Sequence, residues 1–225
     1  MSFTNTMQTI STDAELDAGI AALIAGDPRM ARIAQTVGRP PLRRKPGGFS
    51  GLADIIISQQ VSIPSANAIH AKVEQALGEI TGKTVLAAGQ EVLTKAGLSA
   101  AKARTFLAVA GAEAAGDISF VALETMTNEA VEETLVALKG IGPWSARIYL
   151  LSCLGRADVW PAGDLALQEA VKLALQLASR PSARETIALA EPWRPWRSIA
   201  ARLLWSYYGV VRAQNKPQKQ IGGSI

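Results

Sequence analysis

Apolar side chains recur three or four positions apart along almost the whole chain, and no stretch alternates apolar and polar residues for long enough to indicate a strand. The first clear example places Leu16, Ile20 and Leu23 on one helical face. A capping box formed by Thr12 and Glu15 precedes this run. The pattern predicts an all-α fold of about ten helices joined by short loops.

Caps and helix breakers set the expected boundaries. Ser62 is expected to cap one helix, with Pro64 in its first turn, and Ser99 is expected to cap another. Two short helices are expected at 83–88 and 90–95. The other predicted ranges include 29–37, 100–115, 143–154, 165–177, 182–190 and 195–211.

The stretch 134–171 contains an unusual turn. Gly140-Ile141-Gly142 interrupts a helical pattern, and Pro143 suits the first position of the next helix. Glycines on either side of Ile141 allow positive φ there, and we expect Ile141 to be tucked under the turn. A helix N-terminus behind such a turn presents N–H groups that can bind phosphate. The same pattern is also typical of an ordinary helical hairpin.

The side chains that follow the hairpin suggest chemistry. Asp164 directly precedes an apolar helix and is therefore expected to cap it, but its place after the rigid turn 160–163 also suits a carboxylate at the mouth of a cleft. All five tryptophans lie at or after position 144. Trp193 and Trp196 are expected to be packing anchors. Trp144 lies in the exposed first turn after the hairpin, where it can stack on a flat or cationic ligand.

Charge favours a nucleic-acid partner without requiring one. The net charge is +4 and the pI is about 9.4. The segment 191–225 contains six Lys or Arg and one carboxylate, whereas the segment 113–133 is acidic. We therefore expect one positively charged face. The basic loop 39–48 is either a solvated linker or an arm that contacts phosphate.

Cysteine and hydropathy narrow the class further. Cys153 is the only cysteine, so the sequence predicts no disulfide framework, no cysteine-type zinc site and no iron–sulfur cluster, and Cys153 is expected to be buried. The single histidine, His70, is expected at the surface or satisfied by a partner, not as a ligand. With neither a signal peptide nor an apolar run of membrane length, a cytoplasmic protein is expected, nucleoid-associated if bacterial.

The motifs LKGIGPWSA and VWPAGDLALQEAV resemble the hairpin and catalytic-aspartate loop of the helix-hairpin-helix DNA glycosylase superfamily, most closely its alkylation-repair branch, 3-methyladenine DNA glycosylase II. FSGLADIIISQQVS, GLSAAKARTFLAVA and WRPWRSIAARLLWSYYG resemble further helices of that branch, so the likeness covers nearly all of 13–212.

The resemblance implies a two-lobed helical fold with an interlobe cleft, built as one compact glycosylase module over residues 1–225. Lobe one would be a helical barrel at 46–162 that contains the hairpin at 131–154. Lobe two would combine 11–45 with 163–212, and 213–225 would be a flexible tail.

The resemblance also implies a role for individual residues. Asp164 matches the catalytic aspartate, and Trp144 and Trp205 match aromatic positions of the base pocket. Gln60 matches the side chain that fills the gap left by an extruded nucleotide, a role that Gln59 or Val61 could share. The remaining matches are the DNA-backbone clamp at Gly140, Gly142, Trp144 and Ser145, and the carbonyls of Val136, Leu138 and Gly140, which would hold Na⁺ or K⁺. Lys139 departs from the more usual proline before the hairpin.

Members of the superfamily that also cut the DNA backbone use a lysine two residues after the second hairpin glycine. This chain has Trp144 there. The resemblance therefore implies a monofunctional enzyme with no organic cofactor, acting as a monomer on double-stranded DNA that contains alkylated purines.

Three alternatives remain at this point. The chain could be a non-catalytic module that binds only DNA backbone. It could act on a different base, such as adenine opposite an oxidised guanine or a mismatched thymine, although those branches usually carry four cysteines. An interaction scaffold is the third alternative, and the basic C-terminal third argues against it.

Overall fold

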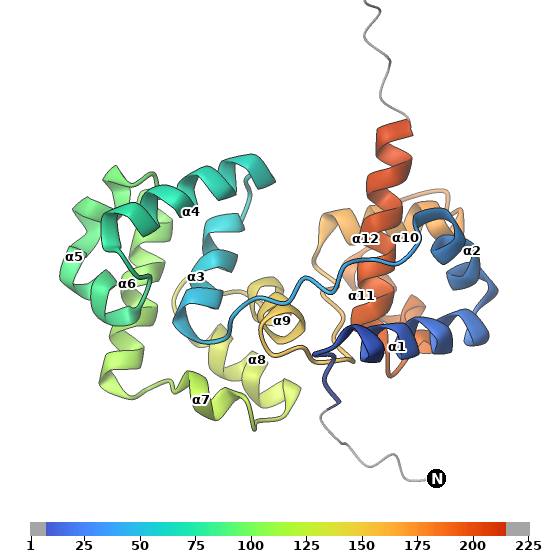
Figure 1. The fold of residues 1–225 in the computed structure, drawn as a ribbon, viewed down its shortest axis with the longest axis horizontal. Helices are drawn as coiled ribbons and strands as arrows, with labels where there is room; N and C mark the ends of the chain where they lie inside the picture. Colours follow the sequence, from blue (N-terminus) through green and yellow to red (C-terminus); the bar gives the residue numbers. More distant parts are fainter. Residues whose placement is uncertain (1–7, 215–225) are drawn as a thin grey trace, which may run out of the picture. The chain divides into compact units, whose positions relative to one another are not determined.

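Helices form the framework of the described residues, 8–214, in the computed structural model (Figure 1). No strand occurs in this range, where the β-type pairing consists of an isolated bridge between Thr9 and Arg156. The all-α prediction is therefore confirmed for residues 8–214. No helix in this part of the chain is long and apolar enough to cross a membrane.

Packing divides the chain into two units. Among the described residues, unit 1 comprises 8–12 and 42–161, and unit 2 comprises 13–41 and 162–214. The lobe bounds that the resemblance implies, 46–162 and 11–45 with 163–212, stay a prediction. The expected tail at 213–225 lies outside the described residues from position 215 onward.

Unit 1 is built around α3, whose residues Leu52, Ile55, Ile56 and Ile57 are all buried. Because both sides of this helix are apolar, it can pack against α4, α6, α7 and α9 at once. The helices of unit 1 are α3 (Gly48–Ser58), α4 (Ile63–Leu77), α5 (Gly82–Lys95), α6 (Ala100–Ala115), α7 (Phe120–Leu123), α8 (Asn128–Val136) and α9 (Pro143–Ser152).

Local signals in unit 1 agree with the sequence prediction. The Ser62 side chain accepts the N–H of Ser65 and the Ser99 side chain accepts that of Lys102, so both serines cap their helices. Gly89, with φ +68°, breaks α5 between the two short helices that were expected there. Cys153 is buried, and this burial raises the pKa of its thiol to about 12.

In unit 2, α10 and α12 pack together and α2 packs against α12. Gly19 lets its helix pack closely against the helix of Ile199, because a Cβ at position 19 would lie 2.1 Å from Cδ1 of Ile199. The helices of unit 2 are α1 (Asp13–Gly26), α2 (Pro28–Val37), α10 (Leu165–Leu175), α11 (Ala183–Leu189), the 3₁₀ turn η1 (Glu191–Trp193) and α12 (Arg197–Gln214).

A buried polar cluster joins distant parts of unit 2. Asp27 caps α2, pairs with Arg29 and accepts a hydrogen bond of 2.9 Å from Nε1 of Trp193, whose side chain is completely buried. These contacts lower the pKa of Asp27 to about 2, mainly through the hydrogen bonds from Arg29. Trp193 is thus a packing anchor, as predicted.

Candidate functional site

The turn between α8 and α9 has the geometry of a tight hairpin. After α8 ends at Val136, the carbonyl of Leu138 accepts the N–H of Ile141 at 3.1 Å, and the Ile141 side chain is 5% exposed. Helical hydrogen bonding in α9 begins with the N–H of Ala146 bonded to the carbonyl of Gly142. The N–H groups of Trp144 and Ser145 therefore belong to the first turn, where a helix has no carbonyl of its own to offer them.

The two hairpin glycines serve different purposes. Gly140 has φ +88°, and a Cβ there would lie 2.0 Å from Oγ1 of Thr105. Gly142 has φ −105°, which any residue adopts, and a Cβ there would meet nothing within 4 Å. The positive φ that glycine allows at both positions therefore occurs at Gly140 and not at Gly142. The fold requires glycine at 140, whereas neither its dihedral angles nor a contact within the described residues requires glycine at 142.

The first turn of α9 contains one aromatic and one buried hydroxyl. Trp144 is half-buried, and Ser145 is 3% exposed. Oγ of Ser145 accepts a hydrogen bond of 2.8 Å from Nε2 of Gln59, a residue 86 positions earlier in the chain. The Ser145 side chain is therefore directed toward the protein.

The corner between α3 and α4 distinguishes the three residues that the sequence could not separate. Gln59 directly follows α3 and is half-buried, and its side chain is hydrogen-bonded to Ser145. Gln60 is exposed and has φ +56°, a left-handed conformation that is uncommon for a residue other than glycine. Val61 is 38% exposed. Gln60 and Val61 thus present their side chains at the surface of unit 1, and Gln59 does not.

In unit 2 the start of α10 fixes a carboxylate. Oδ1 of Asp164 accepts the N–H of Leu167 at 2.7 Å and Nε1–H of Trp205 at 3.1 Å. The predicted cap is present, and a second donor from α12 acts on the same oxygen. Gly163, next to Asp164, is exposed, and a Cβ at this position would meet nothing within 4 Å.

The structure thus groups the predicted residues within each unit. Asp164 and Trp205 meet in unit 2. The hairpin, Trp144 and the corner belong to unit 1, where Gln59 joins corner to hairpin.

Backbone carbonyls suit a monovalent cation at the hairpin. Val136 is the last residue of α8, and Leu138 and Gly140 follow it, so their carbonyls lie at the end of the helix that carries the negative end of the dipole. The carbonyl of Leu138 also accepts the N–H of Ile141 and has one further lone pair. Neutral oxygens of this kind fit Na⁺ or K⁺. No group of three His, Cys, Asp or Glu side chains that could hold a metal ion occurs among the described residues.

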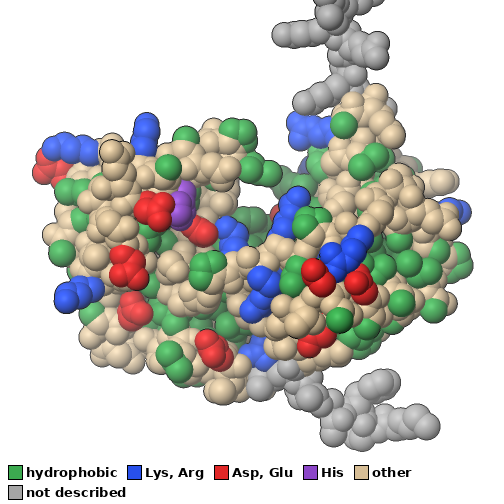
Figure 2. Space-filling model, viewed as in Figure 1, with side chains coloured by type: hydrophobic (Ala, Val, Ile, Leu, Met, Phe, Trp, Pro, Cys, Tyr) green, Lys and Arg blue, Asp and Glu red, His purple; other side chains and the backbone are tan. Residues whose placement is uncertain are grey.

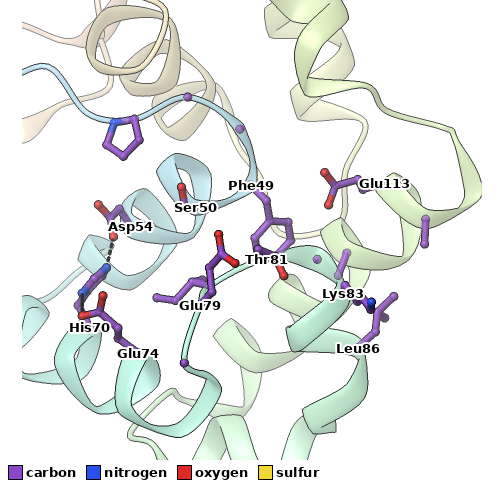
Figure 3. Close-up of a pocket in the computed structure, with 18 residues that line it drawn as sticks. Phe49, Ser50, Asp54, His70, Glu74, Glu79, Thr81, Lys83, Leu86 and Glu113 are labelled. Atoms are coloured by element: carbon purple, nitrogen blue, oxygen red, sulfur yellow. Dashed lines mark ion pairs between the residues drawn. The ribbon is translucent and has the colours of Figure 1, made fainter.

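A cavity of about 930 Å³ in unit 1 is lined by none of these predicted residues (Figure 3). It lies between α3, α4, α5 and α6, and its polar lining is mainly acidic. Nε2 of His70 lies 2.7 Å from Oδ1 of Asp54, so the histidine is satisfied by a partner, and burial raises the pKa of Glu113. Figure 2 shows acidic side chains beside the histidine. Carboxylates repel phosphate, so this cavity is unsuited to DNA.

Two of the four cations in the basic loop 39–48, Arg39 and Lys45, form ion pairs within the protein. Arg39 pairs with Asp13 and Asp17 in unit 2, and Nζ of Lys45 lies 3.1 Å from Oδ2 of Asp54 in unit 1. These ion pairs favour the linker interpretation over a phosphate-binding arm.

Lys102 on α6 belongs to the segment GLSAAKARTFLAVA that carries the family resemblance, but the sequence analysis gave this residue no role. Its Nζ donates hydrogen bonds of 2.7 Å to the carbonyls of both Ile57 and Gln59. A signal for it exists in the sequence, because Lys102 lies one helical turn before the buried Phe106 and is thus a charged residue at the edge of an apolar face.

Comparison with known proteins gives a consistent result. A sequence model of the HhH-GPD superfamily base excision DNA repair proteins matches residues 53–195. The alkylbase DNA glycosidase-like protein mag2 of Schizosaccharomyces pombe is 32% identical over 162 residues, which cover 70% of this chain and 76% of that protein.

Solved structures resemble most of this chain. A 3-methyladenine DNA glycosylase of S. pombe in complex with abasic DNA is 28% identical, with a TM-score of 0.77 over 84% of this chain and 95% of that one. A DNA-3-methyladenine glycosidase of Bacillus halodurans is 30% identical, with a TM-score of 0.76 over 92% of this chain and 95% of that one.

Proposed function

Because this chain belongs to the HhH-GPD superfamily of base excision DNA repair proteins, we propose that it is a monofunctional DNA glycosylase that removes alkylated purines from duplex DNA. The observation that carries the proposal is the Asp164 carboxylate, which is held by two N–H donors at the start of α10 within the span that matches the family. The names of the similar proteins, which refer to 3-methyladenine or to alkylated bases, support the substrate class.

The proposed chemistry needs little acid assistance. A purine alkylated at N3 or N7 is already cationic, so its bond to C1′ is weak. As this bond breaks, the electron pair leaves with the base, and positive charge grows on the sugar. The Asp164 carboxylate stabilises that charge and orients or deprotonates the water whose oxygen attacks C1′. The products are the free base and an abasic site.

Aromatic side chains are proposed to retain the base. A purine that has left the stack can lie against the indole of Trp144 or Trp205, and a cationic purine gains about 1–2 kcal/mol from such a contact once water is excluded. Trp205 is supported in this role by its bond to Asp164, which ties an aromatic ring to the carboxylate that would act on the sugar.

DNA contacts are proposed for the hairpin and for the α3–α4 corner of unit 1. The first turn of α9 would bind a phosphate through its N–H groups, with Na⁺ or K⁺ held by the carbonyls of Val136, Leu138 and Gly140. Gln60 would fill the gap left by the extruded nucleotide. A left-handed residue that is not glycine costs roughly 1–2 kcal/mol in backbone strain, which suggests that the side chain at this position is needed.

The absence of lyase activity is the finer part of the proposal. It rests on position 144, where a strand-cutting mechanism needs an amine that attacks C1′ and this chain has tryptophan. Without that amine no Schiff base forms at this position, and the abasic strand stays intact.

One assay tests the proposal. Duplexes that contain 3-methyladenine, 7-methylguanine, ethenoadenine or hypoxanthine are incubated with the protein and then divided into samples with and without hot alkali. We expect released base and strand cleavage in alkali only, and a loss of roughly a hundredfold or more in rate for Asp164→Asn. A protein that binds an abasic duplex but releases no base would be the non-catalytic module instead. Strand cleavage without alkali would contradict the monofunctional assignment.

A further inference from the structure

Helix α6 contacts both the α3–α4 corner and the hairpin of unit 1 through one face. Lys102 donates to the carbonyls of Ile57 and Gln59 at the α3–α4 corner. Thr105 packs against the hairpin, where its Oγ1 would lie 2.0 Å from a Cβ on Gly140. These two residues are three positions apart on α6 and therefore share a helical face. One rigid element thus touches both corner and hairpin.

The contacts of Lys102 are unusual for a lysine. No carboxylate forms an ion pair with it in the described structure, and its hydrogen bonds go to two backbone carbonyls. Burial lowers the pKa of its amine, so placing the amine there has an energetic cost. The carbonyls at the end of α3 carry the negative end of the helix dipole and compensate part of that cost. The amine of Lys102 is therefore held at the α3–α4 corner by these two hydrogen bonds.

The corner is also tied from the other side. The Gln59 side chain donates to Oγ of Ser145 in the first turn of α9, so the residue whose carbonyl binds Lys102 is also joined to the hairpin helix. Gln60 follows directly and is exposed. With its preceding neighbour bonded to both α6 and α9, the backbone that leads into Gln60 has little freedom.

We propose that Lys102 is a positioning residue that fixes the α3–α4 corner, and hence Gln60, at a constant distance from the phosphate-binding hairpin. This inference rests on the proposed function, because it concerns the extrusion of a nucleotide from duplex DNA. Filling the gap in the stack requires Gln60 to arrive in register with the phosphate bound at the hairpin. If the corner moves by even 1 Å, Gln60 no longer meets the gap in register, and the rate of base excision falls.

The test compares paired and bulged substrates. Lys102→Met removes the three donors but keeps most of the apolar stem, and Lys102→Arg keeps donors that can reach the two carbonyls. Lys95→Met on α5 is the matched control, since Lys95 is exposed and bonded to Glu91. Each protein is assayed under single-turnover conditions on a lesion paired in a duplex and on the same lesion in a one-nucleotide bulge. The bulged lesion has no opposite base, so its extrusion leaves no gap that Gln60 would have to fill.

We expect Lys102→Met to slow excision from the paired duplex by about ten- to a hundredfold, the scale on which a misplaced group slows a reaction, and to slow excision from the bulge by about threefold or less. Lys102→Arg should recover most of the rate, and Lys95→Met should match the wild type on both substrates. Equal losses on the paired and bulged substrates would mean that Lys102 only stabilises the fold, and the proposal would be overturned.

A double-mutant cycle provides an independent readout. If Lys102 acts through Gln60, then adding Lys102→Met to Gln60→Ala should change the rate on the paired duplex by less than about twofold, whereas independent effects would multiply. Should Lys102→Met fail to fold, as judged by circular dichroism and thermal unfolding, Ser145→Ala takes its place. That change releases the corner on the α9 side and should give the same preference for the bulge.

Failure of the proposed function can be recognised separately. A fluorescent adenine analogue placed beside an abasic analogue reports unstacking without any bond cleavage. If the wild type releases no base but gives this signal, the chemistry has failed, and a weaker signal with Lys102→Met still supports the positioning role. An unchanged signal in Lys102→Met overturns that role whatever the chemistry.

Discussion

Nε1 of Trp205 donates a hydrogen bond of 3.1 Å to Oδ1 of Asp164, and the same oxygen accepts the N–H of Leu167. A helix cap and an aromatic side chain from the last helix therefore share one carboxylate oxygen. Asp164 has a structural role in α10, and the bond from Trp205 adds an orientation that the cap alone does not need.

Trp205→Phe should separate the aromatic ring from its N–H group. The variant keeps an apolar ring but loses the donor, so we expect a base-excision rate lower by about tenfold, with little change in the affinity for an abasic duplex. Single-turnover rates and binding titrations measure the two effects. Trp196→Phe on the same unit is the control. A Trp205→Phe protein with the wild-type rate would show that the hydrogen bond has no part in the reaction.

Asp164→Ser should separate capping from catalysis. Serine accepts the N–H of an N-terminal turn as well as aspartate does, so the free energy of unfolding should change by less than about 1 kcal/mol. The negative charge beside the sugar is lost, and the excision rate should fall by roughly a hundredfold or more. Denaturant unfolding and rate measurements on the same preparation are compared with Asp164→Ala, which should lose both the cap and the activity. Retained activity in Asp164→Ser would remove the basis of the proposed mechanism.

The two hairpin glycines should respond differently to alanine. Gly140→Ala forces a Cβ into Thr105 at positive φ and should destabilise unit 1 by roughly 1–3 kcal/mol. Gly142→Ala has neither problem, so its unfolding should resemble that of the wild type while its affinity for duplex DNA falls severalfold. Thermal unfolding and DNA titration of both variants measure the contrast. Equal DNA affinity of Gly142→Ala and wild type would indicate that nothing approaches this backbone closely.

Asp27 should make stability depend on pH at the acidic end. Its pKa is lowered from 3.8 to about 2 in the folded state, so its contribution is complete above the unfolded value and disappears as the pH falls through about 2. A shift of this size corresponds to about 2 kcal/mol. We expect the difference in unfolding free energy between the wild type and Asp27→Asn to shrink by that amount between pH 5 and pH 2, as measured by urea unfolding at each pH. A constant difference would contradict the assignment.

A cation at the hairpin should be visible in DNA binding. Replacing Na⁺ and K⁺ by tetramethylammonium at constant ionic strength leaves phosphate screening unchanged but provides no ion that three carbonyls can hold. We expect the affinity for an abasic duplex to fall severalfold, and KCl to restore it. Equal affinity in both salts would argue against a bound cation.

Much of the fold follows from residues that are close in sequence. The caps at Ser62, Ser99 and Asp164 and the break at Gly89 depend on hydrogen bonds or dihedral angles within one turn, so the order of residues is enough to predict them. The hairpin with its buried Ile141 is recognisable for the same reason. These features made the helical fold and the family resemblance accessible from the sequence alone.

Tertiary structure alone decided the roles of adjacent, chemically similar residues. Gln59 and Gln60 are neighbours of the same type, yet only packing against α9 and α6 directs one to Ser145 and leaves the other exposed. The bond from Trp205 to Asp164 spans 41 positions, and no local pattern encodes it. Such contacts depend on how helices far apart in sequence come together, because side-chain direction is set by the whole core and not by the neighbouring residues.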